Sequence, residues 1–144
     1  MFFFYDIEYL CLLNSLKQLE LIEQDGYKIY VPEMQLLNYS ASIRAQIKEL
    51  SIGNGIDIVD YDGFSEFLIN NRLTYSHFGK GFLFLLHCAK RKNGIVVIDS
   101  ERKSQLKLCE DLDIDTLSVA EFSSNVIRNK DYLIFINKIR SEMI

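Results

Sequence analysis

Short apolar runs alternate with longer amphipathic segments along this chain of 144 residues, which predicts strands alternating with helices. The run from Phe2 to Tyr5 has no polar break, as expected for a strand covered on both faces. Ile95 to Ile98 follows a glycine and is rich in β-branched residues, so it predicts a second buried strand. The remaining predicted strands are Lys28 to Val31, Ile56 to Val59 and, as a short edge strand or turn, Thr116 to Val119.

The segments between these strands have the residue spacing of helices. From Ile7 to about Glu23, apolar residues recur every three positions and predict one helix. Pro32 suits the first turn of a second helix that runs to about Leu50, with Leu37 on its inward face. Further helices are predicted over Phe64 to Asn70, Phe82 to Lys92 and Glu101 to Asp111, followed by one or two terminal helices.

This order of elements predicts a three-layer α/β/α fold around a central, mainly parallel sheet of four to five strands. A mass of 16.8 kDa fits a single domain over residues 1–144. Hydrophobic residues make up 49% of the chain and proline occurs once, so the composition excludes a disordered protein.

The charge of the chain restricts its partners. Its net charge of -4 argues against a basic surface over the whole molecule, although a local basic patch stays open. Such a patch would flank the fourth strand and contact RNA, or else it is an ordinary solvated helix face. Its residues are Lys90, Arg91, Lys92, Arg102, Lys103 and Lys107.

Cysteine usage and apolar run length indicate the compartment. Cys11, Cys88 and Cys109 are an odd number without CxxC spacing, which predicts reduced thiols and a cytoplasmic protein. No apolar run approaches the roughly 20 residues of a membrane span, so we expect no membrane contact.

His77 and His87 lack a partner at zinc-ligand spacing, so we interpret them as a loop residue and a helix residue.

Asp6 and Asp99 follow the first and fourth predicted strands. Ligands of open parallel sheets collect beyond the carboxyl ends of the strands. If these strands are neighbours, the two side chains start about 5 Å apart. Their repulsion at 4 Å is about 4 kcal/mol at an effective dielectric of about 20, and a divalent cation, a lysine or a proton must offset it. The alternative is that each aspartate caps the helix that follows.

Four features follow one another along the chain: an aspartate after the first strand, a helix opened by proline, a glycine pair that opens a later helix, and an aspartate after the next strand. They are Asp6, Pro32, the segment Gly79 to Gly81, and Asp99. Residues 3–39 and 79–114, which contain them, resemble the PIN-domain family, including the VapC-type toxins. The resemblance implies a PIN-like fold whose four acids hold Mg²⁺ or Mn²⁺ and cleave RNA. It also implies a homodimer and an antitoxin-like protein partner.

Two of the four acidic positions of that family carry other residues here. Asn38 stands at the second position, and Phe82 stands where the acid of the later helix belongs. An asparagine oxygen can ligate Mg²⁺ but adds no charge, and a phenyl ring can do neither. The resemblance therefore implies that Asp6, Asp99 and Asn38 are weak metal ligands, and that Asp6 and Asp99 are the catalytic residues if cleavage survives.

Other side chains could compensate for the missing acids. Glu33 is the best placed acid, although a residue in the first turn of a helix also complements the helix dipole. Alternatively, Lys80 or Lys103 reaches the two aspartates and replaces the metal with an ammonium group. The same two lysines are candidates for contacts with an RNA substrate.

We therefore expect a divergent PIN-like protein with a degraded metal site, which binds nucleic acid or protein and has little or no nuclease activity. Mg²⁺ or Mn²⁺ would be weakly bound or absent. The alternative is a weak Mg²⁺- or Mn²⁺-dependent ribonuclease of the toxin-antitoxin type.

Overall fold

Five parallel strands form one sheet in the computed structural model, which describes residues 1–53, 55–74 and 77–143. The strand order is β3-β2-β1-β4-β5, so β1 lies at the centre and β4 is its neighbour. The predicted strands are confirmed within a residue or two, and the last one pairs with β4 as an edge strand. The bounds are β1 Phe2–Phe4, β2 Ile29–Pro32, β3 Ile56–Val59, β4 Ile95–Val97 and β5 Thr116–Leu117.

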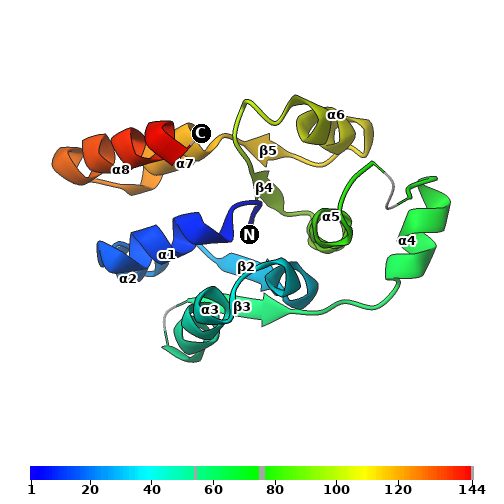
Figure 1. Cartoon of the computed structure of the whole chain (residues 1–144), viewed down its shortest axis with the longest axis horizontal. Coiled ribbons are helices and arrows are strands. Elements are labelled where there is room, and N and C mark those ends of the chain that lie inside the picture. The colour runs from blue at the N-terminus through cyan, green and yellow to red at the C-terminus, as the bar shows by residue number, and fades with distance from the viewer. Residues whose placement is uncertain (54, 75–76, 144) are drawn as a thin grey trace.

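Helices cover both faces of this sheet, as predicted for a three-layer α/β/α fold (Figure 1). The α-helices are α1 Ile7–Ser15, α2 Leu19–Gln24, α3 Ala41–Gly53, α4 Phe64–Asn70, α5 Lys80–Lys92, α6 Lys103–Asp111, α7 Val119–Val126 and α8 Lys130–Met143. A 3-10 helix, η1, spans Glu33–Asn38.

The side-chain alternation of the central strands divides the core into two clusters. Phe4 and Val97 face the cluster formed with α1, α2, α3, α7 and α8. Phe3 and Val96 face the opposite cluster, formed with α4, α5 and α6. In Figure 1 these two sets of helices lie to the left and to the right of the sheet. Because β1 and β4 are buried on both faces, their runs carry no polar residue.

The helix predicted over Ile7 to Glu23 is divided into α1 and α2. Lys17 lies between them with a φ of 56°, in the left-handed region. A non-glycine residue in this conformation ends a right-handed helix. The prediction of one unbroken helix was wrong because apolar spacing does not report the backbone conformation of a single residue.

The helix predicted from Pro32 to Leu50 is also divided. η1 follows β2 directly, and α3 starts after Ser40, whose hydroxyl accepts a hydrogen bond from the Ile43 N–H at 3.3 Å. Serine caps helix N-termini in this way, so a new helix begins there. Leu37, predicted to face inward, is 68% exposed, because the 3-10 turns of η1 place it differently from an α-helix.

Candidate functional site

The pairing of β1 with β4 brings two acids to the same edge of the sheet. Phe4 is in register with Val97, so Asp6 and Asp99 each follow just beyond the carboxyl end of their strand. The Oδ1 atom of Asp6 accepts a hydrogen bond from the N–H of Glu8 at 3.0 Å and caps α1. Asp6 is therefore both the helix cap and one of two converging carboxylates, so the two sequence-based interpretations hold together for this residue.

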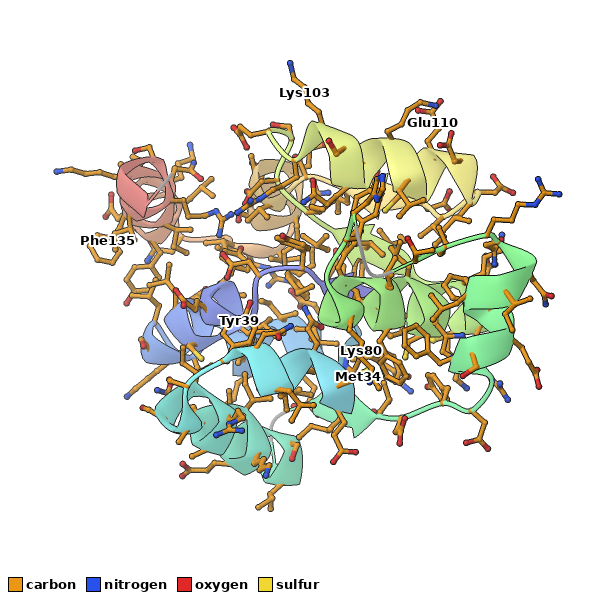
Figure 2. The ribbon with its side chains drawn as sticks, turned by 45° about the vertical axis from the view of Figure 1, so that its right-hand side comes forward. Met34, Tyr39, Lys80, Lys103, Glu110 and Phe135 are labelled. Carbon is orange, nitrogen blue, oxygen red and sulfur yellow. The ribbon has the colours of Figure 1, made fainter. Side chains whose placement is uncertain are left out.

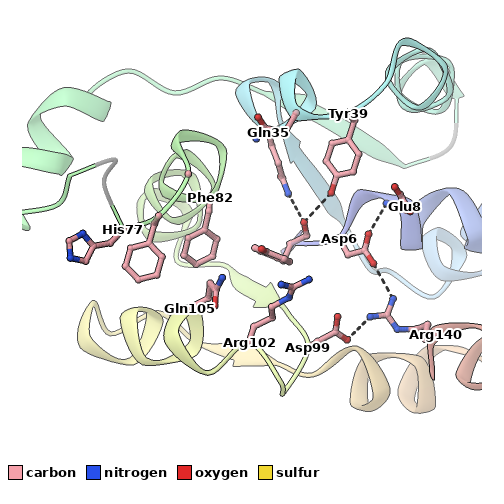
Figure 3. Close-up of a pocket in the computed structure, with 14 residues that line it drawn as sticks. Asp6, Glu8, Gln35, Tyr39, His77, Phe82, Asp99, Arg102, Gln105 and Arg140 are labelled. Carbon is pink, nitrogen blue, oxygen red and sulfur yellow. Dashed lines mark hydrogen bonds and ion pairs between the residues drawn. The ribbon is translucent and has the colours of Figure 1, made fainter. Parts of the chain in front are cut away.

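Arg140 of α8 lies between the two carboxylates (Figure 3). Its Nη1 is 3.3 Å from Oδ2 of Asp6, and its Nη2 donates a hydrogen bond to Oδ1 of Asp99. The side chain of Arg140 is only 10% exposed. We call Asp6, Arg140 and Asp99 the ion triad. The planar fork of arginine suits this geometry, because two of its nitrogens donate to different carboxylates at once.

The cation of the ion triad is an arginine that the sequence analysis did not identify. One alternative for the compensating group was Lys80 or Lys103, but Lys103 lines a different cavity on α6, and Figure 2 shows it extending away from the molecule. Lys80 is exposed in the first turn of α5 and does not line the site. A signal for Arg140 does exist in the sequence. It follows Ile136 by four positions, which places an arginine on the buried side of an apolar helix.

A buried tyrosine packs against the guanidinium of the ion triad. The guanidinium of Arg140 lies 5.1 Å from the centre of the Tyr9 ring, within the range of a cation–π contact. The Tyr9 hydroxyl shares a hydrogen bond with the hydroxyl of Ser123 on α7. Burial raises the pKa of Tyr9 to about 12, although Ser123 and Arg140 oppose the shift. Tyr9 therefore stays neutral at physiological pH and adds no further anion to the site.

A pocket of about 560 Å³ opens beside the ion triad, between η1, the start of α5 and the start of α6. Figure 3 shows Phe82 and Gln105 on one side of this pocket and the ion triad on the other. Its lining residues are Tyr5, Asp6, Glu8, Gln35, Asn38, Tyr39, His77, Phe78, Gly79, Phe82, Asp99, Arg102, Gln105 and Arg140.

Asn38 and Phe82, which the resemblance to PIN domains sets at two acidic positions, both line this pocket. The Nδ2 atom of Asn38 lies only 2.4 Å from the point where a Cβ on residue 81 would stand, so Gly81 makes room for this amide. The Phe82 ring meets the Tyr5 ring edge to face, with their centres 5.5 Å apart. Phe82 is 9% exposed and packs into the apolar cluster of α5.

Two polar side chains of the η1 region hold the turn between β1 and α1. Nε2 of Gln35 donates hydrogen bonds to the carbonyls of Phe4 and Tyr5, at 2.7 and 3.1 Å. The hydroxyl of Tyr39 accepts a hydrogen bond from the Ile7 N–H at 3.2 Å. Because this turn carries Asp6, these bonds position the carboxylate against Arg140.

The donor set of the site fits a guanidinium better than a hydrated Mg²⁺. Arg140 already pairs with one oxygen of Asp6 and one of Asp99, while the other oxygen of Asp6 caps α1. Mg²⁺ requires an octahedron of oxygens and several formal negative charges. Within residues 1–53, 55–74 and 77–143, no group of three or more His, Cys, Asp or Glu side chains is arranged to hold a metal ion.

Two side chains of the predicted basic patch form hydrogen bonds with backbone carbonyls of the protein itself. Lys90 donates a hydrogen bond to the Leu112 carbonyl at 2.8 Å, and Arg91 donates one to the Asp62 carbonyl at 2.9 Å. His87 on α5 bonds the same Asp62 carbonyl at 2.9 Å and packs among aromatic rings, as expected of a structural helix residue. Arg102 is the member of this basic group that lines the pocket.

The three cysteines are free thiols, as predicted. Burial raises the pKa of Cys88 to about 12 and that of Cys109 to about 11. Thiols that stay protonated are poor nucleophiles, so these two cysteines fill the core around α5 and α6 rather than supply chemistry.

Comparison with known proteins adds no relative. No protein-family model, curated protein or solved structure matches the chain. No helix in the described ranges is long and apolar enough to cross a lipid bilayer.

Proposed function

We propose that this chain is a divergent PIN-like domain that binds single-stranded nucleic acid and has little or no nuclease activity. The observation that carries the proposal is the position of Arg140, whose guanidinium lies between the two carboxylates that a metal ion would have to share. A divalent cation would bind weakly or not at all, because it would have to displace a guanidinium that both aspartates already hold.

The pocket beside the ion triad favours nucleic acid over a protein segment. Rings of Tyr5, Phe78 and Phe82 line it together with the guanidinium of Arg102. Aromatic rings and arginine planes are the groups on which unpaired bases stack, and arginine also pairs with phosphate. Arg102 already lies over the Tyr5 ring at 5.3 Å, which places a positive charge at the edge of the pocket.

The alternative function, a weak Mn²⁺-dependent ribonuclease, makes a different prediction for the two aspartates. The test incubates the purified chain with mixed single-stranded RNA and Mn²⁺ and follows binding by fluorescence anisotropy and cleavage by gel electrophoresis. We expect binding that survives chelation of divalent cations, and no cleavage. Cleavage that Asp6→Asn and Asp99→Asn both abolish, while Asp111→Asn on α6 leaves it intact, would favour the ribonuclease and overturn the proposal.

A basic side chain of the pocket tests the nucleic-acid part separately. Arg102→Gln should weaken RNA binding and reduce its salt dependence, because log affinity falls with log salt in proportion to the phosphates contacted. Lys48→Gln removes one positive charge from the exposed side of α3, outside both the pocket and the predicted basic patch, and serves as the control. If RNA does not bind at all, a protein partner becomes the better proposal.

The homodimer and the antitoxin-like partner stay predictions. Tyr132, Ile134 and Phe135 are exposed on α8, and Figure 2 shows Phe135 projecting outward from this helix. Exposed apolar side chains of this kind support an interface. Light scattering during gel filtration tests the dimer, and co-purification from native cells tests the protein partner.

A further inference from the structure

We propose that the pocket accepts one unpaired nucleobase, which packs against Phe78 and Phe82 while side-chain amides bind its edge. This inference rests on the proposed nucleic-acid function and names the part of the nucleic acid that enters the site. Its starting point is Phe82, which stands where the resemblance to PIN domains calls for an acid and which here lines the pocket with its ring.

The apolar wall of the pocket is a continuous row of rings. The Phe82 ring centre lies 5.5 Å from that of Tyr5 and 5.7 Å from that of Phe78. Phe82 is nearly buried, whereas Tyr5 and Phe78 are half-buried. The Phe82 ring meets the Tyr5 ring edge to face and the Phe78 ring at 39°, so a planar heterocycle would stack on a single ring, and any of the four bases offers a suitable face.

Polar groups that lack a partner surround this row. The side-chain amides of Asn38 and Gln105 line the pocket and form no hydrogen bond within the part of the chain that the structure describes. Because each amide both donates and accepts, these groups match the mixed donors and acceptors of a base edge. A purely apolar ligand would leave the amides unpaired, which is costly.

Size and charge select the same kind of ligand. The volume of about 560 Å³ falls within the range of roughly 300–1,000 Å³ that small-molecule sites span. Three carboxylates line the pocket against two guanidiniums, those of Arg102 and Arg140. A neutral base is therefore better tolerated inside than a phosphate, and the sugar-phosphate backbone would stay at the edge, where Arg102 is exposed.

The test measures binding of the full chain to two short single-stranded RNAs. One carries a single 2-aminopurine, whose fluorescence falls when it stacks on an aromatic ring, and the other has an abasic site at the same position. We expect the chain to quench the 2-aminopurine and to bind the abasic RNA at least about fivefold more weakly, the lower bound for stacking of one base on one ring.

Three leucine variants show which rings are responsible. Phe82→Leu and Phe78→Leu should each abolish most of the quenching and weaken binding by about five- to a hundredfold. Phe64→Leu is the matched control, because Phe64 is half-buried in the same apolar cluster but does not line the pocket. If Phe82→Leu fails to fold by circular dichroism, Phe78→Leu tests the proposal alone, since its ring is only partly covered.

The outcomes separate the base pocket from the proposed function. Equal affinity for the base-bearing and the abasic RNA, or quenching that survives both Phe78→Leu and Phe82→Leu, overturns the base pocket. Nucleic-acid binding would then stand and depend on the phosphates alone. Absence of binding to both RNAs overturns the proposed function and the base pocket together.

Discussion

The guanidinium of Arg140 on α8 donates a hydrogen bond to the carboxylate of Asp99, which lies 41 positions earlier in the chain at the end of β4. This bond and the shared contact with Asp6 connect the last helix to the middle of the sheet. The ion triad thus has a structural role, because it neutralises part of the repulsion between two carboxylates held at the ends of neighbouring strands.

We expect Arg140→Gln to lower the free energy of unfolding by about 3–5 kcal/mol, because it leaves two partly buried carboxylates without their cation. Urea denaturation followed by circular dichroism measures the change. Lys138→Gln is the control, since Lys138 lies on the same helix and is exposed. A second change, Asp99→Asn in the Arg140→Gln background, should recover part of the loss. A loss below about 0.5 kcal/mol for Arg140→Gln, the usual size of a surface change, would contradict the structural role of the triad.

Mn²⁺ should leave the thermal unfolding midpoint of the unmodified chain unchanged, because Arg140 already pairs with both aspartates. In the Arg140→Gln variant the two carboxylates are released, so Mn²⁺ should raise the midpoint through binding to the folded state. Differential scanning fluorimetry with and without Mn²⁺ measures both. Adding Asp6→Asn to Arg140→Gln should abolish the gain. Stabilisation of the unmodified chain by Mn²⁺ would contradict the proposal that the guanidinium excludes the cation.

Two glycine-to-alanine changes should differ in their effect on stability. At Gly94 a Cβ would lie 2.6 Å from the buried Phe3 ring and 3.2 Å from the Met1 carbonyl, so Gly94→Ala should cost about 1–3 kcal/mol through overpacking. At Gly81 the only close atom is the free end of Asn38, which can move aside. Gly81→Ala should therefore leave stability unchanged or raise it by up to about 1 kcal/mol, as alanine favours the helix.

Chemical denaturation of the two glycine variants compares them directly. The displaced Asn38 amide should also weaken the proposed binding of a base in the pocket of Gly81→Ala. Equal destabilisation by both changes would show that the contact at Gly81 is as rigid as the one at Gly94.

Stability should fall as the pH rises from about 9 towards about 12. Burial raises the pKa of Cys88 from 9.0 to about 12, and that of Tyr9 from 10.0 to about 12. Each group therefore binds its proton more tightly in the folded state. Its contribution is fully present below the pKa of the unfolded chain and is lost as the pH rises through the folded value.

Urea denaturation across this pH range, compared for the parent chain and Cys88→Ala, tests the assignment. The free energy of unfolding of the variant should fall less steeply with pH, because one group with a raised pKa has been removed. This comparison of slopes does not depend on how stable the variant is at neutral pH. The native thiol of Cys88 should also resist alkylation at pH 8. Fast alkylation there, or an identical pH slope in both proteins, would argue against a deeply buried thiol.

The sequence predicted those features of the structure that depend on a local pattern of residues. The runs at β1 and β4 lack polar residues because both faces are covered, so the strands and the three-layer fold could be predicted. The alternation of strands and helices also implied a parallel sheet, and hence that Asp6 and Asp99 would lie at the same edge if β1 and β4 were neighbours. The sequence therefore predicted that the two carboxylates would lie close together only on the assumption that β1 and β4 are neighbours, and the structure confirms that assumption.

Helix boundaries were less predictable, for a local reason. The breaks at Lys17 and Ser40 depend on the conformation of one or two residues, and the apolar spacing continues across both. Leu37 was assigned to the wrong side because an α-helix and a 3-10 helix rotate successive residues by different angles.

What the sequence alone determined is the order of the elements and the two aspartates that follow strands. The tertiary structure decided which cation meets those aspartates. Arg140 reaches Asp6 from 134 positions away, because α8 packs beside α7 on the face of the sheet where α1 lies. Charge pairing across such a separation depends on how helices dock. The spacing of four residues from Ile136 to Arg140 indicates an arginine on the buried side of the helix, but it does not indicate which acids that arginine meets.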